Sequence, residues 1–247
     1  MSILRKSIFQ LFRKPANPMD PIAVFHSEHY QRHNQKRLEH LASLNLEVAG
    51  KSVLEVGAGI GDHTGFFLER GCQVLSTEAR QENLKVLRRR HPDVRTLQLN
   101  LDYPPFPFDG QYDIVYCYGM LYHLSNPEAA LAFMARCARH LLLLETRVSF
   151  GEGELVNLCV EDARIPSHSL LGQGCRPTRP WVFKQLKALF PFVYMPLTQP
   201  CHEEFPLDWN AMPTETPSRS VFVAARQQIA HPLLVEAIPM RQHRMRP

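Results

Sequence analysis

The 247-residue sequence has no closely spaced cysteines and no long apolar runs. Its six cysteines include no CxxC pair, which argues against structural zinc and cysteine-bound iron–sulfur clusters, so we expect no metal. Scattered cysteines in a chain of this length indicate reduced thiols in the cytoplasm. No apolar run approaches the roughly 20 residues of a membrane span. The N-terminus lacks the apolar core of a secretory signal, so we expect a cytoplasmic protein.

The excess positive charge of the chain is concentrated at its two ends. The net charge is +4 overall, yet residues 15–225 hold 20 basic and 23 acidic residues, a net of −3. A nucleic-acid-binding fold gathers its cations on one face of the domain, so this distribution disfavours a nucleic-acid partner. In residues 2–14, apolar side chains alternate with cations as in an interfacial helix, which offers a membrane surface as an alternative partner.

The apolar pattern predicts one α/β domain over residues 21–226, between a basic N-terminal tail at 1–20 and a C-terminal tail at 227–247. A helical segment covers residues 24–46, and short apolar strands then alternate with helices. The expected strands are 52–56, 73–77, 94–99, 112–118, 141–145, 192–195 and 218–225, and the expected helices are 62–70, 80–90, 127–139 and 180–190. This alternation predicts a parallel sheet with helices on both faces. Residues 148–177, with four glycines and little periodicity, are expected to form an inserted lid.

A glycine-rich turn is the most informative motif. Residues 53–62 read VLEVGAGIGD, so an apolar strand runs directly into a turn that opens a helix. Glycines let the backbone turn sharply and let a ligand approach it closely. Glu78 ends the second strand, 21 residues after Gly57, where a carboxylate would meet ribose hydroxyls. A dinucleotide fold expects GxGxxG, whereas this turn is GxGxG with Glu55 two residues before it.

Together these features resemble class I S-adenosylmethionine-dependent methyltransferases of the small-molecule type. The resemblance covers about residues 50–147, although the Pro-rich stretch 103–107 replaces a helix of the family. It implies a Rossmann-like, doubly wound sheet of seven strands with the last strand antiparallel, an N-terminal helical cover and the inserted lid. S-adenosylmethionine is the implied cofactor and S-adenosylhomocysteine the product. The implied cofactor-binding residues are Glu55, Gly57, Ala58, Gly59, Gly61, Glu78, Ala79, Asn100, Leu101, Asp102 and Tyr118.

Methyl transfer from a sulfonium is an in-line displacement, so the protein aligns the nucleophile and removes its proton. His123 follows the fourth expected strand, at the carboxyl edge where ligands bind, and histidine is the usual base near neutral pH. We therefore interpret His123 as the candidate general base, with a structural cap or hydrogen-bond role as the alternative.

Substrate-binding candidates come from the helical cover, the segment around His123 and the lid. They are Tyr30, His33, Asn34, Tyr122, Arg147, His168 and Arg176. Arg176 and Arg179 stand at a helix entry, where they would either hold an anionic substrate or tie down the lid.

The leading interpretation is methyl transfer to an oxygen or nitrogen of a small molecule. The segment Leu121-Tyr122-His123 is also similar to that of tRNA wobble-uridine carboxymethyl-transfer enzymes, so a tRNA methyl- or carboxymethyl-transferase is an alternative. A second alternative is a cofactor-binding partner subunit without catalysis.

Overall fold

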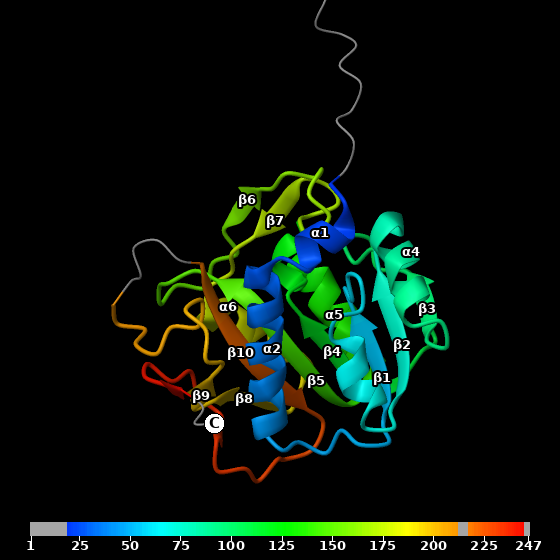
Figure 1. Cartoon of the computed structure of the whole chain (residues 1–247). Helices are drawn as coiled ribbons and strands as arrows, with labels where there is room; N and C mark the ends of the chain where they lie inside the picture. The colour runs from blue at the N-terminus through cyan, green and yellow to red at the C-terminus, as the bar shows by residue number, and fades with distance from the viewer. Residues whose placement is uncertain (1–18, 212–216, 245–247) are drawn as a thin grey trace, which may run out of the picture.

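A mixed eight-stranded sheet forms the centre of the structure, a computed structural model that describes residues 19–211 and 217–244 (Figure 1). The strand order is β11-β8-β10-β5-β4-β1-β2-β3. The bounds are β1 Ser52–Val56, β2 Gln73–Glu78, β3 Arg95–Gln98, β4 Tyr112–Tyr118, β5 Ala138–Val148, β8 Phe192–Pro196, β10 Ser218–Ala225 and β11 Leu234–Val235.

Strand directions confirm the expected fold class. The first five strands run parallel, and β10 inserts antiparallel between β5 and β8. All seven expected strands are present, and the two-residue β11 adds an eighth at the edge. β1 pairs with β2 on one side and with β4 on the other, so the connections diverge at the carboxyl end of β1. Ligands of open α/β sheets bind at such a switch point.

Helices cover the sheet on both faces. The helices are α1 Pro21–Phe25, α2 Glu28–Ser43, α3 Thr64–Leu68, α4 Gln81–Arg90, α5 Pro127–Cys137 and α6 Arg179–Leu189, with a short 3₁₀ turn at Leu121–His123. Leu142 and Leu144 of β5 pack with α5 and α6, whereas Leu143 packs on the opposite face with α2 and α3. Because both faces are buried, the central strands are continuously apolar, which explains why the sequence pattern revealed them.

Several expected elements differ in their bounds, and two differences have a clear structural cause. The single helix expected at 24–46 is broken into α1 and α2, because Ser27 adopts an extended conformation at the start of α2. The strand expected at 141–145 extends over Ala138–Val148, because β5 pairs with β10 as far as Val148 and with β4 at Ala138.

The expected lid at 148–177 contains a short hairpin, β6 Leu158–Val160 and β7 Gln173–Cys175, which lies at the same end of the sheet as α1 (Figure 1). Strands of three residues carry too little periodicity to stand out in the sequence. Thr178 caps α6 by accepting a hydrogen bond from the Trp181 amide, as the sequence predicts.

The C-terminal segment differs from the expected tail at 227–247. Its described part, up to residue 244, adds β11 and also β12 His243–Arg244, which pairs with β9 Thr198–Gln199. Gln242 is buried and donates to the Pro196 carbonyl, so this part packs on the domain. Residues 1–18, with the proposed interfacial helix at 2–14, lie outside the described residues. None of the described helices is long and apolar enough to cross a membrane.

Candidate functional site

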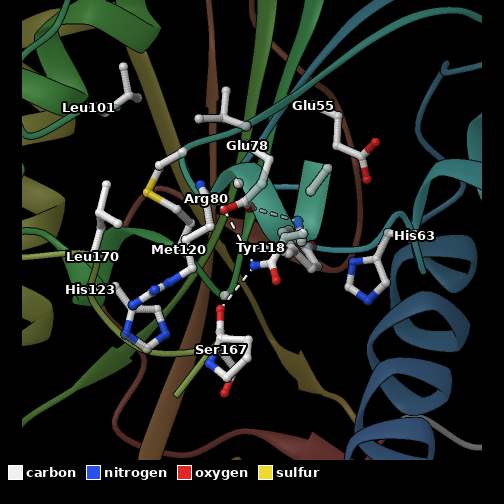
Figure 2. A pocket seen from close by; sticks show the side chains of 18 of the residues that line it. Glu55, His63, Glu78, Arg80, Leu101, Tyr118, Met120, His123, Ser167 and Leu170 are labelled. Atoms are coloured by element: carbon white, nitrogen blue, oxygen red, sulfur yellow. Dashed lines mark hydrogen bonds between the residues drawn. The ribbon is translucent and has the colours of Figure 1, made fainter. Parts of the chain in front are cut away.

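A pocket lies at the carboxyl ends of β1, β2 and β4, between the lid and the α1–α2 cover. Its volume, including the open space at its mouth, is about 1000 Å³. In the view of Figure 2, His123 and Leu170 lie on one side and Glu55 and His63 on the other, with Glu78 between them. Most of the predicted site residues line it: Tyr30, Asn34, Glu55, Gly57, Ala58, Gly59, Glu78, Ala79, Asn100, Leu101, Asp102, Tyr118, Tyr122, His123 and His168. Four predicted residues do not line it: His33, Gly61, Arg147 and Arg176.

The glycine turn has the backbone that its sequence predicts. Gly57 has φ +70°, and a Cβ there would lie 2.4 Å from Cγ of Met120. Gly59 has φ +58°, and a Cβ would lie 3.0 Å from the Phe25 ring. Positive φ and close approach both require glycine here. Gly61 has another role, because it packs against His91, whose Nε2 lies 2.8 Å from its carbonyl oxygen.

Glu78 connects the end of β2 to this turn. Its Oε2 accepts the Gly59 amide at 2.9 Å and its Oε1 accepts the Arg80 amide at 2.8 Å. Burial raises the pKa of Glu78, although both hydrogen bonds act against that shift. The carboxyl group is thus held in place at the floor of the pocket.

Glu55 lies in β1 and supports the start of α3. Its Oε2 accepts hydrogen bonds from the hydroxyls of Thr64 and Ser76, both at 2.6 Å. Burial raises the pKa of Glu55 to about 7, despite these bonds. Glu55 therefore lines the pocket and also connects β1 to the start of α3 and to β2 by hydrogen bonds.

Asp102 fixes the loop after β3. Its Oδ1 accepts the backbone amide and the hydroxyl of Ser125, at 2.7 and 2.8 Å. Asn100 in turn accepts the Asp102 amide at 3.0 Å. The bonds to Ser125 connect this loop to the segment after β4. The two segments, which both line the pocket, are therefore held in a fixed position relative to each other.

His123 forms a pair with Glu161 of the lid, a residue that the sequence pattern did not suggest. Nδ1 of His123 lies 2.5 Å from Oε2 of Glu161. Burial lowers the pKa of His123 to about 4, although the Glu161 carboxylate opposes the shift. Burial alone would raise the pKa of Glu161, but His123 and Arg176 hold it below its ordinary value. Glu161 follows β6, 38 positions after His123, and only the folded lid brings the two together.

Arg176 holds Glu161 rather than lining the pocket. Its Nη2 donates to Oε1 of Glu161 at 2.8 Å, and its Nη1 donates to the Tyr122 carbonyl at 3.1 Å. The Ser169 amide donates to Oε2 of Glu161 at 2.8 Å. The prediction of a direct substrate contact for Arg176 therefore differs from the structure, where its guanidinium already has partners.

Arg80 and Asn83 hold the lid over the pocket, and neither was among the predicted site residues. Arg80 donates to the carbonyls of Ala163 and Ser169 at 2.9 and 2.8 Å, and Asn83 donates to the Pro166 carbonyl at 2.9 Å. Both follow Glu78 closely in the sequence. They bind backbone carbonyls, which any residue can supply. The sequence of the lid therefore gives no indication of these contacts.

The α2 side of the pocket is formed by Tyr30, Asn34 and Arg37. His33, predicted beside them, turns away and is 1% exposed, with its ring 4.7 Å from that of His202. Burial lowers the pKa of His33 well below its ordinary value. His33 differs from its prediction because its position on α2 faces the 200–205 loop rather than the sheet edge.

Among the described residues, His29, His202 and Glu203 form the group whose potential metal ligands lie within 4.8 Å of one another. Arg32 already donates to both carboxylate oxygens of Glu203. Nδ1 of His202 accepts the Glu204 amide at 3.3 Å. The cluster lies outside the pocket, and its members have protein partners.

The strand order, the antiparallel β10 and the glycine turn at the end of β1 define the fold of class I S-adenosylmethionine-dependent methyltransferases. Residues 53–142 match the family described as "Methyltransferase domain". This part of the chain is a methyltransferase domain of class I.

Curated relatives match part of the chain. The ubiquinone biosynthesis O-methyltransferase of Psychrobacter arcticus (strain DSM 17307 / VKM B-2377 / 273-4) is 34% identical over 98 residues. That alignment covers 37% of this chain and 38% of the relative's length.

Solved structures match over most of the chain. The N-terminal domain of EvdMO1, in the presence of S-adenosylhomocysteine (SAH) and D-fucose, has a TM-score of 0.59 at 21% identity, covering 81% of this chain and 85% of that one. The Burkholderia thailandensis 1,6-didemethyltoxoflavin-N1-methyltransferase, with bound 1,6-didemethyltoxoflavin and SAH, has a TM-score of 0.51 at 20% identity, covering 88% and 94%. At these identities the likeness concerns the fold.

Proposed function

We propose that this chain transfers a methyl group from S-adenosylmethionine to an oxygen of a small molecule. The observation that carries the proposal is the His123–Glu161 pair, which opens onto the same pocket as the glycine turn and Glu78. Oxygen is favoured over nitrogen because the curated relative quoted above is an O-methyltransferase.

The pocket residues fit the cofactor. Gly57 and Gly59 give the turn its positive φ angles, and both line the pocket. Glu78 and Asp102 also line it, and we assign them to the ribose hydroxyls and the adenine amino group. The hydroxyl of Tyr118 and Oδ1 of Asn83 are buried in the pocket lining without a partner among the described residues, as expected of groups that await a polar ligand. When bound, the cofactor supplies the activated methyl group.

His123 is the proposed base. Because the Glu161 carboxylate accepts the Nδ1 proton, the tautomer leaves the Nε2 lone pair free for the pocket. Nε2 of His123 would take the proton of the acceptor hydroxyl, and the bound cofactor would give its methyl group to that oxygen and leave as S-adenosylhomocysteine, with its methyl–sulfur bond broken. Burial keeps His123 neutral at pH 7, as a base must be, since it lowers the histidine pKa to about 4.

Calorimetry with SAH tests the cofactor site. We expect saturable binding at one site per chain, and absence of binding at millimolar SAH contradicts the proposal. The alternatives give other results. A tRNA-modifying enzyme would bind tRNA with a steep salt dependence. A non-catalytic subunit would bind SAH but turn over none of a broad panel of hydroxylated acceptors.

His123→Gln tests the base with an acceptor found in that panel. Loss of general-base catalysis lowers kcat by about 10²- to 10⁴-fold, while the Kd for SAH stays unchanged. His140→Gln is the control, because His140 is half-exposed and lies outside the pocket lining. A His123→Gln enzyme with wild-type kcat would assign His123 a structural role.

A further inference from the structure

A network of buried ion pairs lies beside the pocket, between α2, β5 and β10. Glu145 accepts from Arg37 at 2.8 Å and from Arg219 at 3.0 Å. Arg219 also pairs with Glu204 through its Nε. On the lid side, Arg176 pairs with Glu161. Each of these arginines therefore has an acidic partner.

Arg147 is the exception in this region. Across residues 19–211 and 217–244, its guanidinium makes no hydrogen bond or ion pair, and its Nε is buried without a partner. It is also the register partner of Arg219, so two cations stand opposite each other on neighbouring strands. Like charges directly opposite in a sheet are destabilising.

The charges of this region do not balance. The arginines at 37, 147, 176 and 219 face the glutamates at 145, 161 and 204, which leaves one positive charge in excess. The neighbouring histidines supply no anion. An uncompensated, partly buried cation costs folding free energy. The cation–π contact of Arg147 with Tyr122 stabilises the fold but supplies no negative charge, whereas binding of an anion does.

Arg147 lies outside the pocket lining, but it contacts Tyr122, which belongs to that lining. It stands one position before the end of β5, and its Cζ lies 5.1 Å from the centroid of the Tyr122 ring. Tyr122 lines the pocket beside His123. Nη2 of Arg219 donates to the Tyr122 hydroxyl at 3.0 Å, which leaves the phenolic proton free for donation to a ligand.

We propose that Arg147 binds a carboxylate of the methyl acceptor, so that the acceptor is a small hydroxy acid. The inference rests on the proposed function and names its substrate class. The planar guanidinium matches a carboxylate with two parallel hydrogen bonds. The single excess charge suits a carboxylate monoanion better than a phosphate dianion. Such an anion also separates Arg147 from the opposing Arg219.

The first experiment measures thermal stability without any ligand. We expect Arg147→Met to raise the melting temperature by about 2–4 °C, since it removes the like-charge pair while keeping an apolar contact to Tyr122. Arg219→Met is the contrasting variant and should lower the melting temperature, because it breaks two buried ion pairs. Arg139→Met, at an exposed ion pair, is the control and should change little. A fall for Arg147→Met similar to that for Arg219→Met overturns the inference.

The second experiment measures ligand charge preference by calorimetry on SAH-loaded protein. The probes are two pairs that differ in charge, salicylate with salicylamide and lactate with lactamide. We expect at least one acid to bind tenfold or more tightly than its amide, and Arg147→Met to abolish that preference. Arg147→Lys should retain part of it, and Arg139→Met all of it.

Equal binding of acid and amide in both pairs overturns the carboxylate assignment. Failure of SAH to bind the wild-type chain is a different result, which contradicts the proposed function. The melting-temperature comparison of the Arg147 variant does not depend on SAH, so the two failures are distinguishable.

Discussion

The side chain of His123 depends on one lid residue for its chemistry. Glu161 accepts from Nδ1, and Arg176 and the Ser169 amide hold both carboxylate oxygens. A histidine without such a partner would exchange between its two tautomers. Its ring orientation would not be fixed, so Nδ1 rather than Nε2 could carry the lone pair. Glu161 is therefore a positioning residue that acts through His123.

Glu161→Gln should lower kcat by about 10- to 100-fold, the usual effect of removing a group that orients a functional histidine. The Kd for SAH should stay unchanged, because Glu161 lies outside the pocket lining. Proton NMR gives the structural signature: the downfield Nδ1–H resonance of His123 should move upfield when a neutral amide replaces the carboxylate. Glu154→Gln, at an exposed pair with Lys184, is the control. An unmoved resonance would show that Glu161 does not orient His123.

At the scale of elements, the turn between β1 and α3 is the part that tolerates least change. Its glycines have positive φ, and Met120 of the segment after β4 packs directly on Gly57. The turn therefore fixes both the floor of the pocket and the position of the segment that carries His123.

Gly57→Ala should weaken SAH binding by at least tenfold and lower the melting temperature. The added Cβ would lie 2.4 Å from Met120 Cγ, and φ of +70° disfavours alanine by about 1–2 kcal/mol. Gly65→Ala is the matched control. Gly65 lies in α3 with nothing within 4 Å of an added Cβ, so alanine there should be neutral or stabilising. Wild-type SAH affinity in Gly57→Ala, measured by calorimetry, would contradict this role of the turn.

The regular elements were predictable from the sequence, and the lid contacts were not. Buried strands such as β1 and β4 are short apolar runs, and the turn after β1 carries its own glycine signature. These local signals predicted Glu78 and His123 as site residues, and both line one pocket. Glu161 and Arg80 act through partners distant in sequence, so no local pattern marks them. The absence of His33 from the pocket lining was unpredictable for a similar reason, because His202 of the loop that buries it follows 169 positions later in the chain.

At the scale of the whole molecule, the protein buries many neutral histidines. The structure lowers the pKa of six of its 12 histidines, with burial as the largest cause in each: His33, His40, His63, His123, His168 and His202. Burial raises the pKa of two carboxyl groups, Glu55 and Glu78. Proton binding by the unfolded chain therefore affects stability near neutral pH.

The free energy of unfolding should decrease as the pH falls from 7 to 5. A histidine whose folded pKa lies below its unfolded value of 6.5 binds a proton only after unfolding, so acid favours the unfolded chain. With a folded pKa of about 4, as for His40 and His123, the loss by pH 5 is at most about 2 kcal/mol per group. Glu55 and Glu78 act oppositely, since their raised folded pKa values favour folding as the pH falls. Two carboxyl groups do not offset six histidines.

Urea unfolding at pH 7, 6 and 5 measures this dependence. His40→Gln sharpens the test, because Gln can keep a hydrogen bond to Thr198 but cannot bind a proton. We expect the variant to lose less stability than the wild type between pH 7 and 5. A free energy of unfolding that is constant or rises toward pH 5 would contradict the lowered pKa values of these histidines taken as a group.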